Sequence, residues 1–116
     1  MQIDERSAGD VLVLDLRGKF TAGEGDAAIK DRILNLAVSG SRKIVLNFAD
    51  VSYMDSVGLS TMVRSRLTMQ QYGGELKLLR LPRRIADLLA VTRLTMLFET
   101  FDDESSAIRS FQPRDK

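Results

Sequence analysis

Cysteine and histidine are both absent from the 116 residues of this sequence. Without thiols there is no disulfide framework, no thiolate metal site and no cysteine nucleophile. Without an imidazole, Ser56 lacks a base for nucleophilic catalysis, and Asp55 beside it does not make a Ser-His-Asp arrangement. The remaining candidate metal ligands are scattered carboxylates. We therefore expect a protein that is not an enzyme and that holds no metal and no cofactor.

An excess of charge of one sign is also lacking. Seventeen basic and sixteen acidic residues leave a net charge of +1, which gives no electrostatic footprint for nucleic acid or for an anionic membrane. No apolar run approaches the ~18–20 residues of a membrane span, and the opening MQIDERSAGD lacks the apolar centre of a signal peptide. We expect a cytoplasmic protein that neither inserts into a membrane nor binds nucleic acid.

Apolar residues recur with two alternating periods along the chain. Strand patterns are predicted around Ile3 and over residues 11–16, 44–48, 75–81 and 97–101. Helical stripes are predicted from residue 26 to an end at Gly40, over residues 57–72, from Pro82 through Leu89, and over residues 102–111. Strands that alternate with helices predict an α/β fold, in which a mixed, mostly parallel sheet packs with about four helices. One domain over residues 1–111 and a polar tail over 112–116 account for the chain.

The helix predicted over residues 57–72 has one broad apolar side. Its apolar arc contains Leu59, Met62, Val63, Leu67 and Met69, with Arg66 lying along the edge. The opposite side contains Thr61, Arg64, Ser65, Thr68 and Gln71. The two methionines are interpreted as core filler, and a partner contact is the alternative.

The segment 18–25 has the G-x-x-x-x-G spacing of a phosphate loop. Glu24 and Gly25 stand where such a loop carries Lys and Ser or Thr, so the charge that would neutralise a phosphate is replaced by its opposite. A nucleotide site is therefore rejected. Thr21 and Glu24 instead have the spacing of a capping box at a helix start.

The stretch VSYMDSVGLST, residues 51–61, follows the most apolar strand pattern of the chain. Asp55 or Ser56 is a candidate N-cap, and Gly58 would permit tight packing. Across a turn predicted at residues 50–52, the Ser56 hydroxyl would project at the mouth of the sheet. The helix N-terminus there would tolerate a phosphate, because its N–H groups are unpaired and its dipole end is positive.

Three segments together carry a resemblance to a known family. Residues 44–48, the Asp-Ser-x-Gly-Leu stretch over 51–59 and the Gly-Gly turn over 73–78 resemble the STAS domain of bacterial anti-sigma factor antagonists. The likeness extends along nearly the whole chain and implies a single-domain STAS-like fold. Asp-Ser-x-Gly alone would be a weak signal, whereas the combination is quite specific.

The resemblance implies a function for Ser56. In that family the serine after the aspartate is phosphorylated by a partner anti-sigma factor with serine-kinase activity, and a serine phosphatase resets the cycle. The unmodified antagonist binds the anti-sigma factor and frees the sigma factor, so ATP and Mg²⁺ belong to the kinase. The alternative is a STAS subunit that only scaffolds a stressosome-like or lipid-transport assembly, without control by Ser56.

The partner surface is expected around Ser56. Its predicted members are Asp55, Val57, Gly58, Ser60, Thr61 and Arg64, with the loop at Thr21 as the next candidate. Two positions depart from the family pattern: many members carry a second Ser or Thr in place of Val57, and an Asp in place of Thr21. The second departure lies in the partner-facing region and bears on which partner is bound rather than on the fold.

Overall fold

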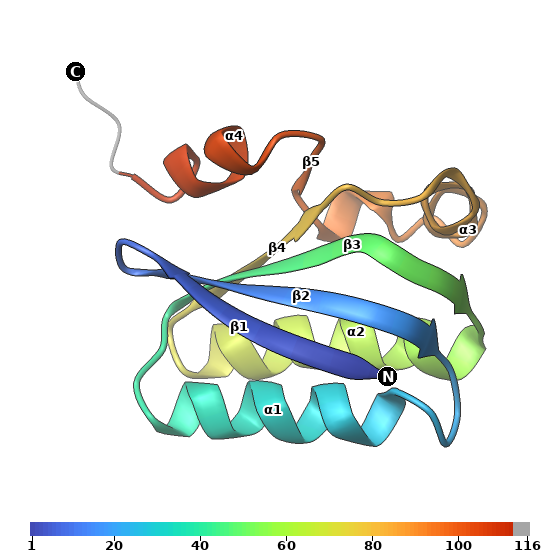
Figure 1. Cartoon of the computed structure of the whole chain (residues 1–116), viewed down its shortest axis with the longest axis horizontal. Helices are drawn as coiled ribbons and strands as arrows, with labels where there is room; N and C mark the ends of the chain where they lie inside the picture. Colours follow the sequence, from blue (N-terminus) through green and yellow to red (C-terminus); the bar gives the residue numbers. More distant parts are fainter. Residues whose placement is uncertain (113–116) are drawn as a thin grey trace.

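The computed structural model describes residues 1–112, which form one sheet with helices on both of its faces (Figure 1). The predicted polar tail lies, apart from Gln112, outside the described residues. The elements in chain order are β1 (Gln2–Ala8), β2 (Val11–Phe20), α1 (Asp26–Val38), β3 (Lys43–Met54), α2 (Ser56–Gln71), β4 (Glu75–Leu79), α3 (Arg83–Val91), the 3-10 helix η1 (Thr95–Leu97), β5 (Thr100–Phe101) and α4 (Glu104–Arg109). The predicted order of strands and helices is confirmed, with η1 added.

The sheet has the order β1-β2-β3-β4-β5. β1 is antiparallel to β2, and the other neighbouring pairs are parallel. This confirms the predicted mixed, mostly parallel sheet. α1 and α2 lie side by side under one face, and α4 lies over the other (Figure 1). Two clusters of buried side chains result, a large one that includes the face towards α1 and α2 and a smaller one under α4.

The central strand β3 is longer than its sequence pattern indicates. Ile44, Val45, Leu46 and Phe48 are fully buried, as expected of a strand that is covered on both faces. The strand continues to Met54, so the turn predicted at residues 50–52 is wrong. Pairing with β2 extends to Met54 and holds this second half extended, although pairing with β4 ends at Asn47. β3 therefore ends at Met54, and a single residue, Asp55, separates it from the start of α2 at Ser56.

Other predicted boundaries shift where tertiary pairing ends. β4 stops at Leu79 rather than at residue 81. β5 has two residues, because only Thr100 and Phe101 pair with β4, and Leu97 belongs to η1. Pro82 is the N-cap of α3 rather than its first residue. The capping box predicted at Thr21 is also wrong. α1 begins at Asp26 without a side-chain cap, and the Thr21 carbonyl instead accepts N–H donors in a backbone turn.

The packing of α2 corrects part of its predicted helical wheel. Met62 and Met69 are fully buried and confirm the apolar arc. Thr61 and Ser65, predicted on the polar side, are only 6% and 2% exposed, whereas Leu67 is 48% exposed. The reason is that α2 packs against α1 as well as against the sheet. Small side chains one turn apart allow two helices to approach closely, so this second buried stripe is not apolar.

Candidate functional site

Asp55 caps the N-terminus of α2. One carboxylate oxygen accepts from the Gly58 N–H at 2.9 Å, and the other accepts from the Ala22 N–H of the β2–α1 loop at 3.1 Å. The hydrogen bond from Gly58 has the largest effect on the pKa of the Asp55 carboxyl, and that from Ala22 the next largest. Both lower this pKa, because they stabilise the ionised form. The choice left open by the sequence is thereby decided, because Asp55 and not Ser56 is the cap.

Gly58 fixes how closely α2 approaches the end of β2. A Cβ atom at this position would lie 2.1 Å from the carbonyl oxygen of Phe20, so only glycine fits. The predicted role of Gly58 in tight packing agrees with this contact. Its predicted place on the partner surface does not, because Gly58 is buried.

The exposed part of the site consists of four side chains on the first turns of α2. These are Ser56, Val57, Ser60 and Arg64. Val57 is 38% exposed, so part of its apolar side chain is accessible to a partner. Thr61 was expected on this surface and is instead buried against α1. Thr21 is half-buried in the β2–α1 loop, which Asp55 joins to the start of α2 through Ala22.

Two hollows adjoin the Ser56 side chain. One, of about 410 Å³, lies between α1 and α2 and is lined by Asp26, Lys30, Ser56, Val57, Ser60, Thr61 and Arg64. The other, of about 440 Å³, is lined by Ser56, Leu59, Ser60, Val63, Arg64, Thr92 and Leu94. Lys30 was missed by sequence reasoning, because it lies 26 positions before Ser56 and nothing in the helical stripe of α1 indicates that it faces α2.

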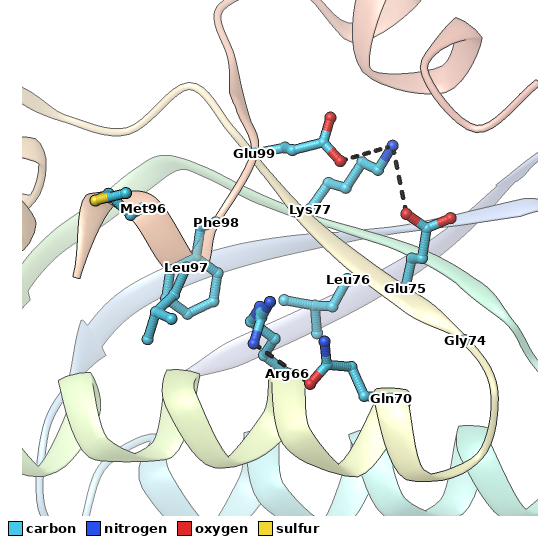
Figure 2. Close-up of a pocket in the computed structure, with 10 residues that line it drawn as sticks. All are labelled: Arg66, Gln70, Gly74, Glu75, Leu76, Lys77, Met96, Leu97, Phe98 and Glu99. Carbon is cyan, nitrogen blue, oxygen red and sulfur yellow. Dashed lines mark hydrogen bonds and ion pairs between the residues drawn. The ribbon is translucent and has the colours of Figure 1, made fainter.

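A third hollow lies elsewhere along α2, between that helix, β4 and η1 (Figure 2). Arg66, half-buried along the packed edge as predicted, donates to Gln70 at 3.3 Å. Lys77 is buried and pairs with Glu99 at 3.3 Å and with Glu75 at 3.8 Å. The cations of this hollow therefore already have partners, and none of the predicted site residues lines it.

The acidic side chains and the helices of residues 1–112 bear on metal binding and membrane insertion. No group of three or more acidic side chains in this part of the chain is placed to hold a metal ion. None of the helices described combines the length and the apolar character needed to cross a bilayer.

Comparison with known proteins places the chain in a family. The family model of the STAS domain matches residues 2–107. The anti-sigma-B factor antagonist of Bacillus subtilis (strain 168) is 35% identical over 77 residues, which cover 63% of this chain and 70% of that protein. The chain therefore belongs to the STAS domain family, in the group of anti-sigma factor antagonists.

Solved structures give the same fold. The putative anti-sigma factor antagonist of Thermotoga maritima matches with a TM-score of 0.85 at 22% identity, over 93% of this chain and 92% of that one. The Bacillus cell fate determinant SpoIIAA in its phosphorylated form matches with a TM-score of 0.75 at 18% identity, over 96% of this chain and 100% of that one. At these identities the likeness concerns the fold alone.

Proposed function

We propose that this protein binds a cognate anti-sigma factor with serine-kinase activity, and that phosphorylation of Ser56 switches it off. Sigma-factor-dependent transcription would then be regulated by the unmodified form, and a serine phosphatase would restore it. One observation carries the proposal. Ser56 is exposed as the first residue of α2, while Asp55 supplies the side-chain cap of that helix. A serine that does not cap the helix remains available to a kinase.

The relatives support this assignment. A protein with the same fold, SpoIIAA, has been solved in both a phosphorylated and an unphosphorylated form, and the curated relative is an antagonist of an anti-sigma factor. The exposed residues Val57, Ser60 and Arg64 surround Ser56 and would form the partner surface. We further propose that the protein has no catalytic activity of its own, since its role is to present this surface.

A phosphate on Ser56 should act on the interface rather than on the fold. It adds about −1.5 to −2 charges at pH 7. Within the domain, the helix N-terminus attracts this charge weakly at an exposed site and Asp55 repels it, so the two effects oppose one another. Against a bound partner the phosphate must shed water, and an uncompensated buried charge costs several kcal/mol. A loss of ~3 kcal/mol weakens binding more than a hundredfold, at about 1.4 kcal/mol per tenfold.

The test is calorimetric binding to the cognate anti-sigma factor. We expect phosphorylated protein and Ser56→Glu to lose binding by more than about a hundredfold while their melting temperatures stay within a few degrees of the parent. Ser56→Ala should bind whether or not the kinase is active. Equal binding by the parent, Ser56→Glu and the authentic phosphoprotein would refute the switch. A stable multi-subunit complex that is indifferent to Ser56→Ala would favour the scaffold role.

A further inference from the structure

Two cations line the same hollow as the Ser56 hydroxyl. Lys30 comes from α1 and Arg64 from α2, and both line the hollow of about 410 Å³ between these helices. Within residues 1–112 neither side chain makes an ion pair or a hydrogen bond, although other cations of the chain do. Arg6, for example, pairs with both Asp15 and Glu104. The two cations beside Ser56 thus have capacity for an anion.

One backbone N–H group at the N-terminus of α2 is already occupied by a carboxylate. Asp55 already accepts the Gly58 N–H at 2.9 Å, so the cap position is filled by a carboxylate. Asp26, which also lines the hollow, accepts the Gly23 N–H at 3.0 Å. The two carboxylates add to the negative charge that a phosphate would bring. Side-chain cations that line the hollow would offset this negative charge.

Lys30 and Arg64 approach the hollow beside Ser56 from two different helices. Arg64 follows Ser56 by eight residues, about 12 Å along the helix axis at ~1.5 Å per residue. Side chains on a helix lean towards its N-terminus, and Arg64 lines the same hollow as Ser56. Lys30 stands one turn after the start of α1 at Asp26, and α1 packs along α2.

We propose that Lys30 and Arg64 stabilise the phosphate of phosphorylated Ser56 electrostatically across the hollow that all three residues line. This inference rests on the proposed modification of Ser56. It adds a second effect to the switch, because the same two cations are free to meet acidic groups of a partner when Ser56 is unmodified. Phosphorylation then neutralises the two positive charges that acidic groups of the partner would otherwise meet.

Phosphorus NMR on protein with phosphoserine incorporated at position 56 during synthesis tests the inference. The second pKa of phosphoserine is about 6, and a cation ~6–8 Å away in water lowers it by roughly 0.3–0.5 units. We expect Lys30→Gln and Arg64→Gln each to raise this pKa by about that amount at low salt, and the double variant to raise it by about the sum. The matched control is Arg66→Gln, which removes a cation of the same helix that already donates to Gln70 and should leave the pKa unchanged.

The inference is overturned if both single variants titrate like the parent, or if Arg66→Gln moves the pKa as far as Arg64→Gln does. Lys30 and Arg64 are exposed, so their replacement should not unfold the domain, and melting curves check this. The phosphoserine is incorporated without a kinase. A negative result here therefore stays separate from failure of the proposed function, which would appear as unchanged partner binding in calorimetry.

Discussion

Replacing Gly58 with alanine should strain the contact between the start of α2 and the end of β2. The added Cβ would lie 2.1 Å from the carbonyl oxygen of Phe20 and 3.0 Å from its carbonyl carbon. Ordinary contacts between heavy atoms begin at about 3.5 Å, so the two segments must separate by more than ~1 Å. A backbone carbonyl cannot rotate away as a side chain can, and the movement would also strain the hydrogen bonds of Asp55 to Gly58 and Ala22.

The net loss of stability follows from two opposing effects. Overpacking typically costs ~1–3 kcal/mol, and a contact with the backbone belongs at the upper end of that range. Alanine is favoured over glycine inside a helix by up to ~1 kcal/mol, which offsets part of the cost. We expect Gly58→Ala to lose about 2 kcal/mol of the ~5–15 kcal/mol that stabilises a domain. At about 4–8 °C per kcal/mol, the melting temperature should fall by roughly 8–16 °C.

Thermal and urea unfolding followed by circular dichroism measure this loss. Ser60→Ala is the matched control, since Ser60 is exposed two residues further along the same helix and its replacement should be neutral or slightly stabilising. A Gly58→Ala protein that melts within a degree or two of the parent would show that the approach of α2 to β2 is not rigid. The packing role assigned to Gly58 would then be refuted.

Three further predictions concern the core, the partner surface and acid stability. Leu46→Ala, on the fully buried part of β3, should cost about 2–5 kcal/mol by urea unfolding, and a loss below about 0.5 kcal/mol would contradict a central position for this strand. Val57→Asp should weaken binding of the anti-sigma factor in calorimetry with little change in melting temperature. Unchanged binding would indicate that the partner surface lies elsewhere, with the loop at Thr21 as the next candidate. The Arg6 guanidinium lowers the pKa of Asp15 and Glu104, so their stabilising effect is present above pH ~4 and is lost as pH falls through the lowered values. The difference in urea midpoint between the parent and Arg6→Gln should therefore shrink between pH 7 and pH 2, and a constant difference would show that the pairs do not couple to folding.

The exposure predicted for the site residues was partly right, and the error at Thr61 has a physical cause. Ser56, Val57, Ser60 and Arg64 are exposed as expected, whereas Thr61 is buried. A helical wheel assigns one buried side, but α2 has two packing partners, the sheet and α1. The second buried stripe contains the small polar residues Thr61 and Ser65, so the hydrophobic pattern of the sequence does not indicate that it is buried.

Local patterns in the sequence determined which segments form strands and helices, because side-chain periods of about 2 and 3.6 reflect which face of each element is buried. They also placed Ser56 at a helix start after a buried strand. Only the tertiary structure decided that β3 runs on to Met54, since its second half is held by pairing with β2. Only the tertiary structure placed Lys30 and Ser56 on the same hollow, because the packing of α1 against α2 joins residues that are distant in the chain. Periodicity reports whether a side chain is buried or exposed, and it carries no information about which other element lies next to that side chain.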